Sequence, residues 1–170
     1  MFQKSLEILD DDTPCCYAFV RGNGQNEAYK DIKGMVLFYK MGQGMLVVTD
    51  LEGLPVNPDA CGGAFFGFHI HEGEACSGNA TDAFADAGAH LNPENCEHPQ
   101  HMGDMPVLIE SGGKCFSVFY TERFNADDIR GKTVIVHSMP DDFRSQPAGD
   151  SGEKMACGTI RCTLFCRQDD

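Results

Sequence analysis

Two apolar runs separated by a short glycine turn place the strongest constraint on how this chain folds. Residues 32–41, IKGMVLFYKM, and residues 45–54, MLVVTDLEGL, are rich in β-branched and aromatic residues, which favour strands. Gly42, Gln43 and Gly44 lie between them, and glycine tolerates the positive φ angles that tight hairpin turns require. The two runs therefore predict an antiparallel hairpin.

Further runs of this kind follow along the chain and predict an all-β fold. Strands are expected at residues 15–22, 64–73, 107–111, 115–124, 132–139 and 155–166. The GGK turn after the third of these predicts a second hairpin, between 107–111 and 115–124. Long helical periodicity is absent, and Asn125 is a candidate N-cap for one short helical turn within 125–132. Short strands separated by turn residues are typical of a sandwich or barrel.

Two long segments interrupt the strand pattern. Residues 74–106 and 140–154 are rich in Gly, Asn, Asp and Pro, and loops of this length inside a compact domain are usually functional or disordered. The length of 170 residues fits one domain. We therefore expect a single domain over 1–170, with an N-terminal extension at 1–13 and two functional loops.

The charge and hydropathy of the chain exclude several partners. The formal net charge is −13, whereas nucleic-acid binding requires clustered Lys and Arg, so no nucleic-acid partner is expected. A run approaching the roughly 18 apolar residues of a membrane span is absent, so no membrane partner is expected. An acidic protein also repels anions, so anion chemistry here would need a local positive patch.

The cysteines and the N-terminal residues bear on the compartment. The first 16 residues, MFQKSLEILDDDTPCC, show no basic n-region followed by an apolar run. The nine cysteines are an odd number, which leaves at least one thiol unpaired in a monomer. A cytoplasmic location with mostly free thiols is the expectation, and an exported mature form stays open.

All six histidines lie between residues 69 and 137. His69 and His71 are two apart on an expected strand, so their side chains share one face about 6–7 Å apart. The others are three in the first long loop, with an aspartate three residues after the last of them, and one at the end of a strand: His90, His98, His101, Asp104 and His137. Imidazole and carboxylate are common transition-metal ligands, so the pattern predicts metal binding.

The ligand types indicate which metals this pattern would suit. Three imidazoles and one carboxylate suit a closed, tetrahedral zinc site of structural character. Four imidazoles suit copper in either oxidation state. Six histidines and one aspartate supply both sites only if one histidine is shared.

Five stretches carry a resemblance to a known family. They are GFHIHEG (67–73), AGAHLNP (87–93), HMGDMP (101–106), VIVHSMPDD (134–142) and SGEKMACGTI (151–160). In this order and spacing, across roughly residues 30–166, the chain resembles the copper/zinc superoxide dismutases, and bacterial members in particular. The resemblance implies an eight-stranded antiparallel Greek-key β-barrel or sandwich, immunoglobulin-like, with two long functional loops; this family is a known example of the sandwich architecture.

The resemblance also implies a role for each ligand. The implied copper ligands are His69, His71, His90 and His137, and the implied zinc ligands are His90, His98, His101 and Asp104. His90 would bridge the two metals and pass a proton to the product. Asp141 would accept hydrogen bonds from histidines of both sites, as partners of ligating imidazoles often do.

The resemblance implies a disulfide between Cys76 and Cys157 that ties the first long loop to the last strand. Cys162 and Cys166 lie on one face of that strand. We expect them to pack there as buried free thiols, because free cysteine behaves as a small hydrophobic residue; a relay for copper is the alternative.

The chain departs from the family pattern at two places. Lys154 stands where the family has an arginine that guides the anion, so the charge is kept but the planar fork of donors is lost. Arg144, in the same loop, could supply part of the positive field. His98 and His101 are only three residues apart, and we expect the loop still to close around zinc.

The implied activity is disproportionation of superoxide to oxygen and hydrogen peroxide, with copper and zinc as cofactors and His90 and Lys154 as catalytic residues. With Lys154 as the guide, the rate should fall as ionic strength rises. Two alternatives stay open: a metal-binding relative with weak or no turnover that buffers or delivers copper, and a purely structural zinc domain. A homodimer is possible.

Overall fold

The computed structural model describes residues 13–56 and 63–163 as an antiparallel β-structure. Its strands are β1 (Cys16–Gly22), β2 (Lys33–Met41), β3 (Gly44–Glu52), β4 (Phe65–Phe66), β5 (Phe68–His71), β6 (Leu108–Ile109), β7 (Lys114–Thr121), β8 (Thr133–His137) and β9 (Lys154–Cys162). Seven form one sheet in the order β5-β8-β9-β1-β2-β3-β7, and β4 pairs with β6 in a second sheet. The expected all-β class is confirmed.

The first predicted hairpin is confirmed, whereas the second forms only its turn. β2 and β3 pair from Lys33–Glu52 to Met41–Gly44. At the second site Ser111 and Lys114 bridge across the turn. β6 then pairs with β4 and β7 pairs with β3, because the chain passes from one sheet to the other at this turn.

The predicted strand over 64–73 is interrupted at Gly67. The Gly67 N–H donates to the Met139 carbonyl (2.7 Å) and the His137 N–H donates to the Gly67 carbonyl (2.8 Å). These bonds tie Gly67 to the chain that leaves β8, between β4 and β5. Residues 64–73 therefore contribute one strand to each sheet, since β4 pairs with β6 and β5 pairs with β8.

The helical content is small. The predicted turn after Asn125 is the helix α2 (Ala126–Ile129), whose capping box joins Asn125 and Asp128 reciprocally. A 3₁₀ turn, η1 (Ala85–Ala87), lies in the first long loop. In the described part of the chain, no helix has the length and apolarity that crossing a membrane requires.

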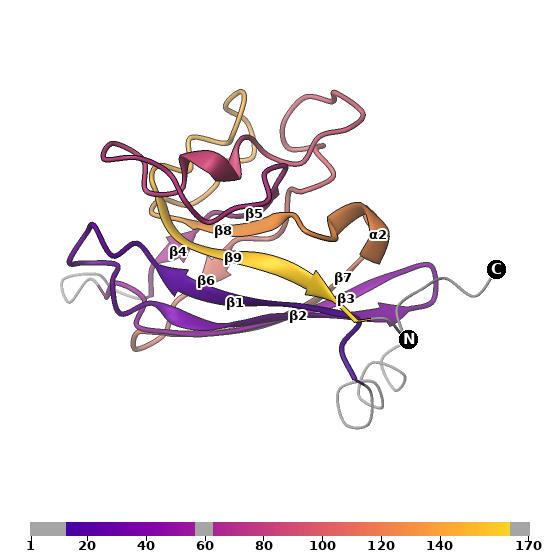
Figure 1. Ribbon diagram of the computed structural model, residues 1–170, viewed down its shortest axis with the longest axis horizontal. Coiled ribbons are helices and arrows are strands. Elements are labelled where there is room, and N and C mark those ends of the chain that lie inside the picture. Colours follow the sequence, from indigo (N-terminus) through magenta and orange to yellow (C-terminus); the bar gives the residue numbers. More distant parts are fainter. Residues whose placement is uncertain (1–12, 57–62, 164–170) are drawn as a thin grey trace.

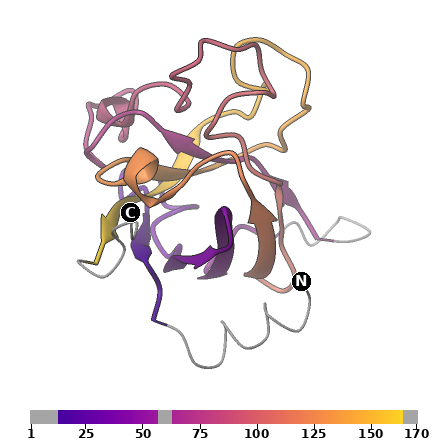
Figure 2. The same ribbon diagram turned by 90° about the vertical axis from the view of Figure 1, so that its right-hand side faces the viewer.

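The strands β5 and β8 are buried on both faces. Phe68 and Ile70 of β5 lie in the main core with Val134 and Val136 of β8, as the period of two along a strand predicts. The opposite face carries the histidines of both strands, and the two long loops lie over it. Figure 1 and Figure 2 show these loops gathered on one side of the molecule, with β1, β2 and β3 on the other side. The histidines of β5 and β8 therefore lie in a buried layer between the sheet and the two long loops.

Disulfide bonds correct the expectation of mostly free thiols. Cys76 pairs with Cys157, and Cys16 of β1 pairs with Cys162 of β9. The expectation that Cys162 packs as a free thiol is therefore wrong, because antiparallel pairing sets Cys162 opposite Cys16. Cys15 is also disulfide-bonded. In the described residues, the free thiols are those of Cys96 and Cys115; Cys166 lies outside the described residues.

Candidate metal centre

Backbone pairing brings the first long loop onto β5. As the edge strand of its sheet, β5 has unpaired backbone groups that another segment can satisfy. The Ile70 N–H donates to the Gly103 carbonyl (2.9 Å), and the Leu91 N–H donates to the Ile70 carbonyl (2.8 Å). His90 then stands opposite His71, and Asp104 stands opposite His69. The sheet edge therefore assembles ligands that are up to 35 positions apart in sequence.

The first assembled group contains imidazoles only. Each of its four buried residues offers a ring nitrogen, and these atoms lie within 4.8 Å of one another: His69, His71, His90 and His137. The Nε2 atoms of His71 and His137 are 3.2 Å apart, close to the roughly 3.3 Å expected of two ligands at 2.0–2.1 Å from one tetrahedral metal. His69 Nδ1 and His90 Nε2 are buried without a hydrogen-bond partner. An unpartnered buried nitrogen is costly unless something else binds it, so this group fits a metal ion.

The second group contains three imidazoles and one carboxylate. Its buried members also lie within 4.8 Å of one another: His90, His98, His101 and Asp104. Asp104 faces the Nδ1 atoms of all three histidines, at 2.8 Å from His90, 3.1 Å from His98 and 3.4 Å from His101. His90 belongs to both groups; its Nδ1 faces Asp104, and its Nε2 is buried without a hydrogen-bond partner. The structure thus places one shared histidine where the ligand count requires it.

Asp141 links the two groups from behind. The His69 Nε2–H donates to its Oδ2 (2.7 Å), and the His98 Nε2–H donates to its Oδ1 (2.9 Å). Both histidines then keep Nδ1 free of protons and directed into the site. This outer hydrogen bond fixes the tautomer of a ligating imidazole and raises its basicity.

Backbone carbonyls orient two further imidazoles. The His71 Nδ1–H donates to the Gly88 carbonyl (2.9 Å). The His137 Nδ1–H donates to the Gly152 carbonyl (3.4 Å). Both histidines therefore present Nε2 to the first group. The two long loops supply these acceptors, so loop closure and ligand orientation are coupled.

Burial favours the neutral form of His71 and His137. Removal from water lowers the pKa of His71 well below its usual range, and neighbouring imidazoles lower it further. For the same reasons, with His69 and His90 as neighbours, the pKa of His137 is lowered to about 3. Metal ions bind neutral imidazole, so the group is ready to bind metal at neutral pH.

The carboxylates of the site stay ionised. Burial by itself would raise the pKa of Asp141, but hydrogen bonds from His69, the Phe143 N–H and His98 outweigh it and lower the pKa to about 2. Burial opposes ionisation of Asp104 too, and the His90 hydrogen bond with the surrounding imidazoles lowers its pKa. A negative charge therefore faces each histidine group.

Lys154 lines the cleft above the histidines but does not stand free in it. The cleft has a volume of about 1310 Å³, and Lys154, His71, His90 and His137 are among its lining residues. Lys154 Nζ donates to Asp82 Oδ2 (2.8 Å) and to the Phe84 carbonyl (3.1 Å). Arg144 is exposed and is not among the residues that line this cleft.

Comparison with known proteins identifies the family to which this arrangement belongs. Residues 32–160 match the family model for copper/zinc superoxide dismutase. The chain belongs to the copper/zinc superoxide dismutase family. The matched span includes every histidine, Asp104, Asp141 and Lys154, and the bacterial relatives below agree with the resemblance expected from the sequence.

Relatives of this superoxide dismutase family member cover most of its length. It is 32% identical over 164 residues to superoxide dismutase [Cu-Zn] from Escherichia coli, covering 85% of this chain and 95% of that one. It is 31% identical over 146 residues to superoxide dismutase [Cu-Zn] 2 from Aquifex aeolicus, covering 77% and 80%. The Cu/Zn superoxide dismutase structure from Brucella abortus matches with a TM-score of 0.68 at 22% identity, over 84% of this chain and 97% of that one. The superoxide dismutase-type β-barrel fold is confirmed.

Some functional features escaped the sequence analysis. Asp82, the partner of Lys154, lies 72 positions away in a polar loop, and the sequence holds no signal that pairs them. The carbonyl acceptors of Gly88 and Gly152 are backbone groups, which a residue pattern does not reveal. The Cys16–Cys162 bond follows from the β1–β9 pairing, which the order of strands along the chain does not specify.

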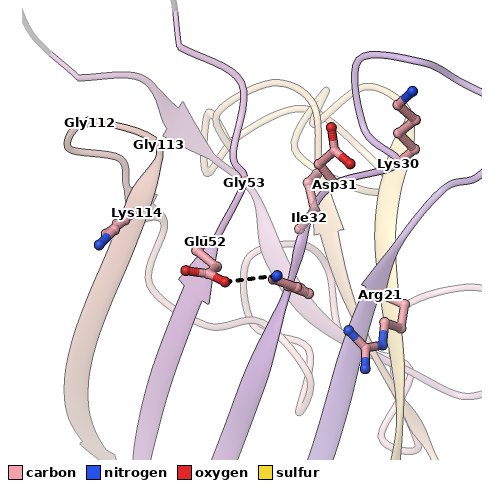
Figure 3. Close-up of a pocket in the computed structure, with 10 residues that line it drawn as sticks. Arg21, Lys30, Asp31, Ile32, Glu52, Gly53, Gly112, Gly113 and Lys114 are labelled. Atoms are coloured by element: carbon pink, nitrogen blue, oxygen red, sulfur yellow. Dashed lines mark ion pairs between the residues drawn. The ribbon is translucent and has the colours of Figure 1, made fainter.

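A second pocket is lined by four cationic side chains. It has a volume of about 530 Å³ and lies where the ends of β1, β2, β3 and β7 meet (Figure 3). Its cationic lining residues are Arg21, Lys30, Lys33 and Lys114, and Lys33 pairs with Glu52 at 3.1 Å. The pocket lining contains no histidine, so this pocket is not a third metal site of the same kind.

Proposed function

We propose that this protein is a superoxide dismutase that disproportionates superoxide to oxygen and hydrogen peroxide with a copper ion and a zinc ion. The shared His90 between an all-imidazole group and a carboxylate-containing group carries the proposal. Bound copper would supply the redox chemistry of this reaction, in which one electron is taken from a first superoxide and returned to a second. The balanced reaction consumes two superoxide ions and two protons for each oxygen and peroxide formed.

The copper ligands are His69, His71, His90 and His137. Their donor set of four imidazoles suits copper in both oxidation states. Unpartnered buried nitrogens on His69 and His90 support this assignment. Hydrogen-bond acceptors behind His69, His71 and His137 hold the three rings in place. These ligands therefore need little reorganisation during the redox reaction.

The zinc ligands are His90, His98, His101 and Asp104. Three imidazoles and one carboxylate make a closed set, typical of a structural zinc site. Their positions, in the loop that pairs with β5, support a role in holding that loop and the His90 ring. Asp141 accepts a hydrogen bond from His69 and another from His98. A His98 ring fixed at the zinc site therefore also helps to hold the His69 ring in place.

His90 is the proposed proton donor. Its Nδ1 faces Asp104 at 2.8 Å, and its Nε2 has no hydrogen-bond partner. His90 also lines the cleft, so Nε2 can take up a proton and give it to the peroxide being formed. Lys154 is the cation that lines this cleft in the described residues, which supports a role in the approach of superoxide.

The compartment follows from the cysteines. Five of the cysteines in the described residues are disulfide-bonded, and disulfides persist mainly in oxidising compartments. This removes the main support for a cytoplasmic location, and we infer an oxidising compartment instead. A homodimer stays a prediction, which sedimentation equilibrium of the metal-loaded protein would test.

Metal analysis coupled to a superoxide assay tests the function. Protein shown to contain one copper and one zinc per chain should dismutate superoxide, and the copper-free form should not. Absence of turnover in the fully loaded protein would contradict the proposal. It would then favour the alternative of a copper-buffering relative, which the complete ligand set does not favour at present.

A further inference from the structure

The cleft above the histidines is acidic. Its charged lining residues, apart from the histidines, are four carboxylates and one ammonium group: Glu72, Asp82, Glu97, Glu153 and Lys154. The substrate proposed above is an anion, which a cleft of net negative charge repels. In the described residues Lys154 is therefore the cationic side chain that lines this cleft, and its charge adds to that of the bound metal ions in attracting an anion.

Asp82 holds Lys154 in a fixed ion pair. The Lys154 side chain is only 16% exposed, and its Nζ lies 2.8 Å from Asp82 Oδ2. The Phe84 carbonyl accepts a second hydrogen bond from the same ammonium group. Partial burial strengthens this pair relative to a fully exposed one, so the charge of Lys154 is largely neutralised where it stands.

The loop around Asp82 is built to keep the carboxylate in this position. Its Oδ1 accepts from the Phe84 N–H (2.9 Å), and its own N–H donates to Asn79 Oδ1 (3.1 Å). The buried Phe84 packs with Ile135 and Cys157 beneath the loop. The carboxylate and the ammonium group are therefore both anchored.

The other cations of the described residues do not line this cleft. Four of them gather in the pocket of Figure 3, which shares no lining residue with the histidine cleft. Opposed side chains on neighbouring strands place Arg21 beside Lys33 there. Arg123 and Lys132 lie closer, but they donate to the backbone carbonyls of His101 and Glu72 and are not among the residues that line the cleft.

We propose that Asp82 is a positioning residue that limits anion access to the metal centre, because it holds Lys154 in an ion pair and leaves the side chains that line the cleft with a net negative charge. This inference rests on the proposed metal site. It weakens the ionic-strength dependence expected from the sequence: anion binding and superoxide turnover should fall less steeply with salt in the unmodified protein than in a protein whose Lys154 is released from Asp82.

Azide binding to the copper- and zinc-loaded protein tests the proposal without relying on turnover. Azide affinity is measured by the absorption of the Cu(II)–azide complex at low and high sodium sulfate. Asp82→Asn removes the charge and keeps the shape, and should tighten azide binding about two- to tenfold at low salt. Added salt should weaken azide binding more in the variant than in the unmodified protein, because the released Lys154 then contributes to the attraction.

Asp86→Asn is the matched control, because it removes the same charge from the same loop at an exposed residue that does not line the cleft. Its Ser77 contact can be kept by the amide oxygen. Equal azide affinities in the Asp82 and Asp86 variants, at equal metal content, would overturn the proposal. So would the same salt dependence of azide binding in the unmodified protein and in the Asp82 variant.

A double-variant cycle identifies the route of the effect. The gain from Asp82→Asn should be larger in the presence of Lys154 than in the Lys154→Gln background, since only then is an ammonium group released to meet the anion. An equal gain in both backgrounds would overturn the positioning role. Superoxide turnover is measured in parallel. Absence of turnover in the loaded protein would contradict the proposed function, whereas equal azide affinities in an active protein would contradict this inference alone.

Discussion

At the scale of single residues, Asp141 connects the two halves of the metal centre. Its two oxygens accept from His69 and His98, which belong to different ligand groups. It is buried, and its pKa of about 2 keeps it ionised at neutral pH. One side chain therefore sets the tautomer of a ligand on each side.

Replacing Asp141 by alanine should weaken zinc binding about 10- to 100-fold, since outer partners of ligating histidines typically contribute this much. The physical reason is that two buried ring N–H groups lose their acceptor. Zinc affinity is measured by competition with a chelator. Asp142→Asn is the control, because the exposed Asp142 caps the next turn through the N–H groups of Arg144 and Ser145. Unchanged affinity in Asp141→Ala would contradict the role of the link.

At the scale of structural elements, the edge strand β5 organises the first long loop. Its own histidines point away from the core, and its free edge receives the loop through Ile70. Gly103 is required where the loop meets the strand, because a Cβ at this residue would meet the Ile70 carbonyl oxygen and carbon. The absence of a side chain at Gly103 thus lets Asp104 reach the site.

Gly103→Ala should push the loop away from β5. The expected cost to the metal-free protein is about 1–3 kcal/mol, the usual range for overpacking a tight contact, with weaker zinc binding as well. Urea unfolding and zinc competition measure the two effects. Gly24→Ala is the control, since a Cβ at Gly24 meets nothing within 4 Å. A variant with the zinc affinity and stability of the control would show that the contact is not required.

At the scale of the whole molecule, two disulfides connect distant parts of the chain. Cys16–Cys162 joins the first and last strands across 146 positions, and Cys76–Cys157 ties the first long loop to β9 across 81. Bonds that close loops of this length restrict the unfolded chain most strongly in the chain-entropy account. Both therefore stabilise the seven-stranded sheet and the loop layer over it.

The double change Cys16→Ala and Cys162→Ala should destabilise the protein by about 2–4 kcal/mol, which corresponds to a fall in Tm of roughly 5–15 °C for a domain of this size. Calorimetry of the metal-free protein without reductant measures the change. Cys96→Ser is the control, because Cys96 is an exposed free thiol. A Tm equal to that of the control would contradict a stabilising role for this bond.

Local patterns were sufficient for much of the fold. The alternation of β-branched and aromatic runs with turn residues predicted every strand region and the Asn125 cap. Pairing was less predictable, as the 107–124 region shows: its turn forms, yet β6 and β7 join different sheets. Which strands pair depends on contacts between distant residues, and these are invisible in a local window.

The sequence by itself determined the ligand chemistry and the strand period, because residue type and spacing suffice for both: His69 and His71 share a face whatever surrounds them. Tertiary structure decided the burial, the hydrogen-bond partners and the nearby charges of those ligands. Loop pairing with β5 buries the imidazoles, Asp141 joins two groups that are distant in sequence, and Asp82 reaches Lys154 across 72 positions. Electrostatic energy depends on distance and burial in space. Only the folded chain therefore revealed that the expected guiding charge is held in an ion pair.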